Sequence, residues 1–145
     1  MRGLQSVVLC VLILVVAAGG QGAAGPRIVH FVAPEYPWYA QLGRVQGDAV
    51  ARASVDASGK VSSLETVRGD ALLVEEMRRA LLQWRFEAGQ AGKLTVTFHF
   101  RIEGMPVSYR PIPKVTADLP DRVEIVVPPL EPNVHVHEYT SRPTK

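Results

Sequence analysis

Apolar and polar positions alternate with a period of two in two long stretches of the chain. In Ala49–Val55 small apolar residues occupy every second position, and in Leu94–Ile102 the same alternation carries larger side chains. This period is typical of strands with one buried face. Because the first stretch offers mainly alanine to that face, we expect a bulky group to lie close against it.

A helical period of apolar residues occupies Ala71–Trp84. Asp70 stands directly before this segment and is a favourable N-cap. Glu75 and Arg79 form a favourable pair on the charged side, which we interpret as a solvent-exposed helix face. The apolar stripe consists of Leu73, Met77, Leu81 and Trp84.

Shorter segments connect these elements. Asp56–Gly59 predicts a four-residue turn, and Val61–Arg68 predicts the returning strand. The apolar residues of that strand break strict alternation, which indicates a bulge. Pro37 fits the first turn of a short helix at Trp38–Leu42, and Gly43 ends it.

The order helix, strand, strand, helix, strand predicts an α+β fold. We expect a small two-layer sandwich, in which a three-stranded antiparallel sheet packs on one main helix. A domain of about 75 residues lies near the lower limit for independent stability, so aromatic side chains should supply much of the core. These are Trp84, Phe86, Phe98 and Phe100.

Composition divides the chain into four segments. Residues 1–24 are predicted to be a signal peptide or a short N-terminal anchor, because an apolar run from Val7 to Ala18 follows Arg2 and precedes small residues. That run is short for a bilayer span of roughly 20 residues. The remaining segments are a linker or lead-in strand (25–32), the predicted domain (33–103) and a proline-rich extended tail (104–145).

Charge and composition narrow the classes of function. The 16 basic and 14 acidic residues give no broad positive field, so nucleic acid is not an expected partner. Cys10 is the single cysteine, which excludes a disulfide within the chain. The sequence has no glycine-rich phosphate loop and no HExxH or GxSxG element, so we predict neither an enzyme nor a cofactor. A weak metal site at His135 and His137, with His99, is an alternative.

An ordered set of residues resembles the C-terminal domain of the TonB family over about residues 33–103. The resemblance implies a TolA/TonB C-terminal-like fold and a periplasmic protein of Gram-negative bacteria. Most of these residues also have structural reasons to be present, since they set bends or fill the core. The set consists of Tyr36, Pro37, Ala40, Gly47, Gly59, Trp84 and Phe86.

The resemblance also implies a mode of binding. In the family, an extended peptide near the N-terminus of an outer-membrane receptor pairs alongside the last strand, which is strand addition. The partner here would be such a segment, or a segment of another envelope protein. The alternative for each candidate contact is an ordinary solvent-facing position. The candidate contacts are Gln41, Thr95, Thr97, His99 and Arg101.

Several features depart from a force-transmitting member of that family. The linker from Gly19 to Pro26 reaches at most about 29 Å when fully extended, and the apolar segment before it lacks histidine. The leading hypothesis is therefore a periplasmic or secreted interaction module. The alternative is an auxiliary energy transducer, anchored by a single pass in the inner membrane, where it would contact motor proteins.

The proline-rich tail contains two β-prone runs, Arg122–Val127 and Val134–His137. Valine is more frequent there than in typical disordered segments. We therefore expect an extended tail that is partly docked on the domain. One hypothesis is that Val123–Val127 pairs with a sheet edge of the same chain and masks the peptide site.

Overall fold

A computed structural model describes residues 25–132. The predicted signal or anchor segment and the two tail histidines His135 and His137 lie outside this range. Among the described residues, no helix is both long enough and apolar enough to cross a membrane. In chain order the elements are β1 (Ile28–His30), α1 (Trp38–Leu42), β2 (Gly47–Val55), β3 (Val61–Arg68), α2 (Ala71–Gln83), β4 (Arg85–Phe86), β5 (Gly92–Ile102), β6 (Lys114–Asp118) and β7 (Arg122–Val127).

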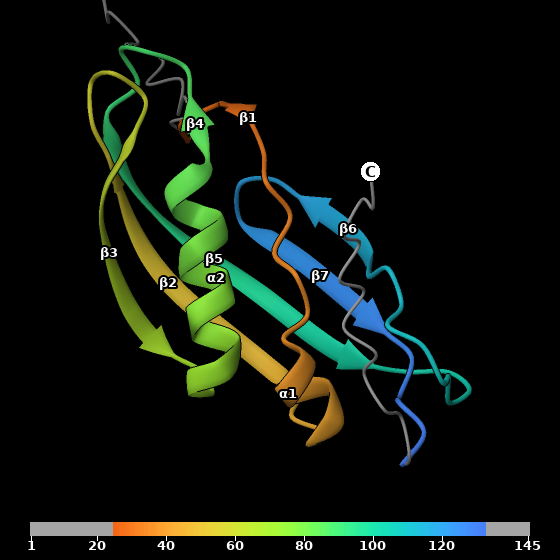
Figure 1. Cartoon of the computed structure of the whole chain (residues 1–145). Helices are drawn as coiled ribbons and strands as arrows, with labels where there is room; N and C mark the ends of the chain where they lie inside the picture. The colour runs from red at the N-terminus through yellow and green to blue at the C-terminus, as the bar shows by residue number, and fades with distance from the viewer. Residues whose placement is uncertain (1–24, 133–145) are drawn as a thin grey trace, which may run out of the picture.

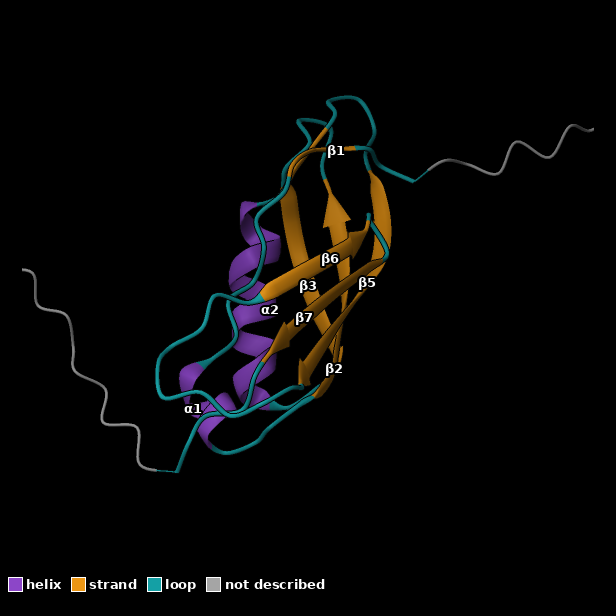
Figure 2. Cartoon of the chain, turned by 90° about the vertical axis from the view of Figure 1, so that its right-hand side faces the viewer, coloured by secondary structure: helices purple, strands orange, loops and turns teal. Residues whose placement is uncertain are grey.

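The fold has two layers, with α2 packed across one face of a twisted sheet (Figures 1 and 2). The sheet has the order β3-β2-β5-β7-β6, and β1 and β4 form a separate two-stranded ribbon. The predicted α+β class is confirmed. The predicted three-stranded sheet is wrong, because β6 and β7 extend it to five strands. β7 runs parallel to β5, whereas the other neighbouring strands are antiparallel.

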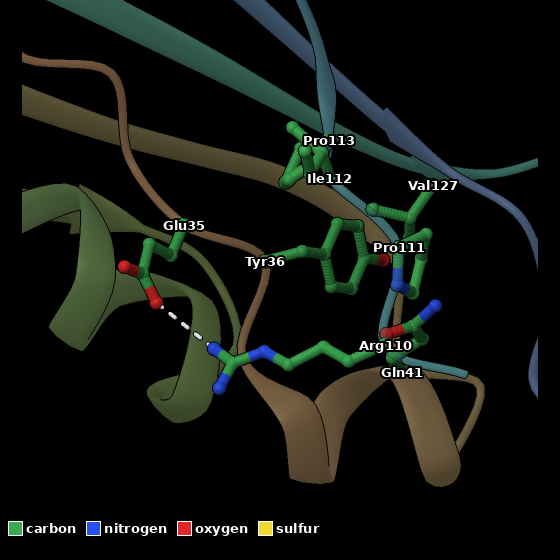
Figure 3. Close-up of a pocket in the computed structure, with 8 residues that line it drawn as sticks. All are labelled: Glu35, Tyr36, Gln41, Arg110, Pro111, Ile112, Pro113 and Val127. Carbon is green, nitrogen blue, oxygen red and sulfur yellow. Dashed lines mark hydrogen bonds and ion pairs between the residues drawn. The ribbon is translucent and has the colours of Figure 1, made fainter. Parts of the chain in front are cut away.

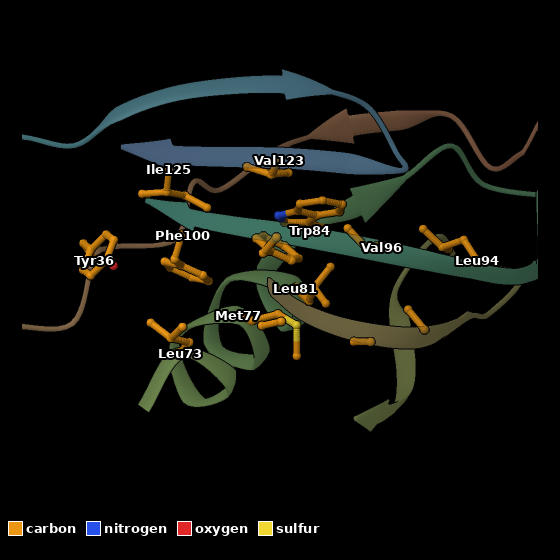
Figure 4. Close-up of a cluster of buried hydrophobic side chains, with 14 of the residues drawn as sticks. Tyr36, Leu73, Met77, Leu81, Trp84, Leu94, Val96, Phe100, Val123 and Ile125 are labelled. Atoms are coloured by element: carbon orange, nitrogen blue, oxygen red, sulfur yellow. The ribbon is translucent and has the colours of Figure 1, made fainter. Parts of the chain in front are cut away.

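The two additional strands come from the segment interpreted as an extended tail. In β7, Val123, Ile125 and Val127 alternate with more polar residues and are almost completely buried. Val123 and Ile125 continue the apolar face of β5 beyond the edge of the predicted sheet (Figure 4). Full burial of a valine or isoleucine contributes about 1.5–3 kcal/mol, so β7 is an integral part of the core.

Trp84 lies at the centre of the core. Its ring is fully buried against Phe98 and Phe31, with ring centroids 5.9 and 5.3 Å away. The indole Nε1 donates a hydrogen bond of 2.9 Å to the carbonyl of Val32. Because a buried indole N–H needs an acceptor, this bond also fixes the segment between β1 and α1 over the sheet.

The local predictions agree with the structure in most details. Asp70 caps α2 through a 2.9 Å bond from the Leu72 N–H to its carboxylate. Pro37 is the N-cap of α1. The pairing of β3 with β2 shifts register at two places, as the broken alternation indicated. The alanines of β2 are buried where α2 crosses that strand, which accounts for their small size.

Candidate functional site

The four candidate contacts on β5 lie on the sheet face opposite α2. They alternate with the buried residues Leu94, Val96, Phe98 and Phe100. The edge of this strand is not free, because β7 pairs with it along Thr97–Ile102. The predicted pairing of Val123–Val127 within the chain is thereby confirmed. Thr97, His99 and Arg101 belong to an internal strand segment, and exposed Thr95 precedes the paired stretch.

Two of these residues form a charged cluster with Asp48 of β2. The Asp48 carboxylate lies 2.7 Å from His99 Nδ1 and 3.2 Å from Arg101 Nη2. Arg68 of β3 lies 3.6 Å from the other carboxylate oxygen. Partial burial opposes ionisation of Asp48. The hydrogen bond and charge of His99, with those of Arg101, outweigh it and lower the Asp48 pKa.

Gln41 lies in the other layer of the molecule, on α1. It is 2% exposed, and its Nε2 donates a 2.6 Å hydrogen bond to the carbonyl of Pro128, just after β7. Arg44, three residues further along the chain, donates to the carbonyl of Leu130 at 3.4 Å. Gln41 therefore binds the chain's own C-terminal segment in this structure, and it lies apart from the candidates on β5.

Tyr36 supports the same corner of the fold. Its hydroxyl donates a 2.7 Å hydrogen bond to the carbonyl of Val45, and its ring meets Phe100 edge-on. Burial raises the Tyr36 pKa to about 12, against the opposing charge of Arg101. Its role is structural, since the hydroxyl stays protonated and holds the turn after α1.

The hydrogen bonds of β7 show which way each backbone group points. The carbonyls of Asp121 and Val127 accept from Thr97 and Glu103 of the neighbouring chain segment at 2.9 Å. Successive residues of a strand direct their N–H and C=O alternately to its two sides. The odd-numbered residues of β7 therefore face β5, and the even-numbered ones face β6.

The same alternation identifies the outward groups of β6. The even-numbered residues of β7 pair with Lys114, Thr116 and Asp118, which complete the internal ladder. The N–H and C=O of Val115 and Ala117 are consequently directed at the outer edge of the sheet. Among residues 25–132, no strand lies beyond β6 in this sheet. The free edge on this side thus belongs to β6.

The opposite edge of the sheet, β3, is partly covered. Arg78 of α2 donates a hydrogen bond to the carbonyl of Leu64 at 3.3 Å, which occupies an outward acceptor of that edge. Register shifts further interrupt the strand. Capping side chains and bulges are devices that protect sheet edges from pairing. The β6 edge is therefore the better site for an added strand.

A hollow of about 340 Å³ lies at the Lys114 end of β6 (Figure 3). Tyr36 and Val127 form its inner wall, and Ile112, which is 94% exposed, projects at its rim. Arg110 and Glu35 form a 2.9 Å ion pair beside it. The further lining residues are Gln41, Pro111 and Pro113.

A second hollow, of about 490 Å³, lies at the Asp118 end of β6. Leu119 and Pro120 line one side, and residues 25–28 line the other. We define the N-terminal segment as residues 25–36. Both hollows therefore lie where this segment meets the two ends of β6. In the sequence, the proline-rich composition of residues 106–120 distinguishes this region from the rest of the chain. It does not indicate that the N-terminal segment lies beside it.

The groups present suit recognition of a polypeptide. Among the described residues, no cluster of three or more His, Cys, Asp or Glu side chains could hold a metal ion. Within residues 25–132, the region offers a strand edge whose outward backbone groups pair with no further strand, flanked by two partly apolar hollows. Fold and site together define a small α+β domain with a sheet edge open to interaction.

Comparison with known proteins identifies the family. The family model described as Gram-negative bacterial TonB protein C-terminal matches residues 32–109, more than half of the chain. The chain belongs to this family, as the ordered set of Tyr36, Pro37, Trp84 and the other motif residues predicted. β6 and β7 lie beyond the matched range.

Curated relatives agree with this assignment. Protein TonB of Klebsiella aerogenes is 31% identical over 85 residues, 57% of this chain and 35% of that protein. Protein TonB of Klebsiella pneumoniae is 28% identical over 88 residues, 59% and 36% of the two chains. The chain thus spans about a third of the length of these relatives. The solution structure of the Pseudomonas aeruginosa TonB C-terminal domain covers 58% of this chain and 93% of its own, with a TM-score of 0.48 and 23% identity.

Proposed function

We propose that this protein is an interaction module of the Gram-negative cell envelope that binds an extended peptide by strand addition. The partner is a segment of an outer-membrane receptor or of another envelope protein. The observation that carries this function is the open outer edge of β6, where Val115 and Ala117 direct backbone groups away from the sheet. Main-chain hydrogen bonds to such an edge supply affinity for an extended peptide.

The site lies on β6 instead of β5 for an energetic reason. A peptide that paired with β5 at Thr97–Ile102 would have to displace β7. Displacement would expose three buried side chains, at a cost of about 5–9 kcal/mol from apolar burial alone. The outer edge of β6 requires no such rearrangement. Peptide binding at a β5 edge that β7 masks in the free protein is therefore less favourable than binding at the β6 edge.

A proline substitution tests this function. Ala117→Pro removes an N–H that points outward, so the internal ladder with β7 is kept. The control is Thr66→Pro on β3, two residues from Leu64 and therefore facing outward in the same way. Synthetic peptides from the N-terminal segments of outer-membrane receptors serve as ligands in calorimetry. We expect Ala117→Pro to weaken binding at least tenfold and Thr66→Pro to leave it unchanged.

The opposite pattern would contradict the assignment. Equal affinities for the wild type and Ala117→Pro would place the peptide elsewhere, and loss of binding in Thr66→Pro alone would place it on β3. The alternative function, an auxiliary energy transducer anchored in the inner membrane, is distinguished by whether residues 1–24 are cleaved. An uncleaved species that is retained in the membrane and crosslinks to motor proteins would favour it.

A further inference from the structure

The two hollows at the ends of β6 have a fixed separation along that strand. Ile112 and Pro113 mark the first hollow, and Leu119 and Pro120 mark the second. Ile112 and Leu119 stand seven positions apart, which corresponds to at most about 23 Å at 3.3 Å per residue, because Leu119 and Pro120 belong to the turn that follows β6. A peptide strand beside β6 would pass both hollows within about that length.

Both hollows lie on the same side of the sheet. The first is walled by Tyr36 and Val127, whose side chains belong to the core layer. The second is walled by Ile28 of β1, which also packs against the core. Between the hollows, half-buried Val115 points into the same layer. The alternate side chains on one face of an added strand would therefore meet both hollows.

The walls determine the chemistry of the side chains that fit. The lining of the second hollow includes Pro26, Ile28, Leu119 and Pro120, and its one ionisable residue is Arg27. In the first hollow, the charges of Arg110 and Glu35 neutralise each other in an ion pair, which leaves Ile112 and the two prolines beside it as apolar contacts. Apolar side chains are the best occupants of both.

We infer that the partner is an extended peptide with two large apolar side chains on one face, six or eight positions apart. The two side chains occupy the hollows, and the backbone between them pairs with Val115 and Ala117. An even separation keeps both side chains on one face. The inference rests on strand addition at β6 and adds the sequence pattern that the partner must carry.

Two synthetic peptides of about eleven residues test the spacing. Both have the same composition, with two phenylalanines in a Thr/Val/Ser background. The phenylalanines stand six positions apart in one and two positions apart in the other, so both peptides keep them on one face. Affinities are measured by calorimetry on the protein purified from the cell envelope. We expect the wider spacing to bind at least tenfold more tightly, and affinities within twofold would overturn the inference.

Substitutions at the two hollows provide a second test. Gly25→Phe fills the second hollow, since a Cβ at Gly25 would lie 4.0 Å from Pro120. Ile112→Asp places a charge at the rim of the first. Each variant should bind the wide-spaced peptide at least fivefold more weakly than the wild type does. The affinity for the narrow-spaced peptide should stay unchanged. Met105→Asp, at an 82% exposed residue outside both hollows, is the matched control. Loss of affinity in the control equal to that in Ile112→Asp would overturn the inference.

The outcomes separate the two proposals. If both peptides bind equally and both lose affinity in Ala117→Pro, strand addition at β6 stands and the two-anchor pattern is wrong. If neither peptide nor any receptor segment binds, the proposed function fails, and the anchor pattern fails with it.

Discussion

Gln41 and Pro128 are joined by a 2.6 Å hydrogen bond between the side-chain Nε2 and the main-chain carbonyl. The bond connects α1 at the start of the domain to the residue that follows β7. Its donor is 2% exposed, so water does not compete for it. The C-terminal strands are thereby tied to the first helix as well as to β5.

Removing this bond should destabilise the whole fold. Gln41→Ala leaves the partly buried carbonyl of Pro128 without its donor, and a buried acceptor without a partner costs about 1–3 kcal/mol. We expect the free energy of unfolding in urea to fall by that amount. The control is Gln83→Ala on the exposed side of α2, which should stay within about 0.5 kcal/mol of wild type. Equal stabilities for the two variants would contradict a structural role for Gln41.

Substitutions in β7 test whether the strand belongs to the core. Ile125→Ala removes a fully buried side chain and should cost about 2–5 kcal/mol. Val126, the next residue, is half-buried on the opposite face, so Val126→Ala should cost less than about 1 kcal/mol. Chemical denaturation measures both. A small effect at Ile125 would show that β7 is a weakly docked tail.

The strands and helix within the family match could be predicted from sequence because each carries a clear period. Leu94–Ile102 alternates strictly, and Asp70 precedes an unbroken apolar stripe. β7 also alternates, yet pairing of a parallel strand depends on where the intervening chain returns, which no local pattern determines. The sheet was therefore predicted two strands too small.

The candidate site was less predictable for a related reason. Whether a strand is an edge depends on its neighbours, so the outward residues of β5 could be identified without knowing that β7 covers Thr97–Ile102. Gln41 was selected through the family resemblance, and its side chain is buried against a segment beyond the family match. Glu35 and Arg110, which form the ion pair beside the first hollow, are far apart in sequence. A single charged residue at either position does not indicate a site.

Gly59 illustrates a motif residue whose requirement is steric. Its φ is +83°, and a Cβ at this position would lie 2.0 Å from the carbonyl oxygen of Phe86. Gly89 has a similar φ of +85° with nothing within 4 Å of such a Cβ. Gly89→Ala should therefore cost about 1–2 kcal/mol from the left-handed backbone alone. Gly59→Ala adds an overpacking term of about 1–3 kcal/mol.

Thermal or urea unfolding of the two alanine variants separates backbone strain from the clash. The expected order of stability is wild type, then Gly89→Ala, then Gly59→Ala. If the two variants were equally stable, the close approach of Gly59 to Phe86 would have no energetic consequence.

The Asp48 cluster predicts a dependence of stability on pH. The pKa of Asp48 is lower in the folded protein than in the unfolded chain, where it is about 3.9. The unfolded state then binds more protons in this range, so stability rises with pH. The contribution is fully present above about pH 3.9 and is lost as pH falls through the folded-state pKa.

Asp48→Asn removes this titration. Urea unfolding measured from about pH 6 down to pH 2.5 should show a smaller loss of stability in the variant than in the wild type. His99 and Arg101 remain in both proteins, so the difference isolates the carboxylate. Parallel pH profiles would contradict the assignment of the lowered pKa to Asp48.

The most direct test of strand addition is amide hydrogen exchange of β6, measured by NMR with and without a bound receptor peptide. In the free protein, the amides of Val115 and Thr116 point in opposite directions, and that of Thr116 is protected by the ladder with β7. We predict that peptide binding protects the amides of Val115 and Ala117 and leaves those of β3 unchanged. Unchanged exchange at Val115 and Ala117 in a saturated complex would contradict binding at the β6 edge.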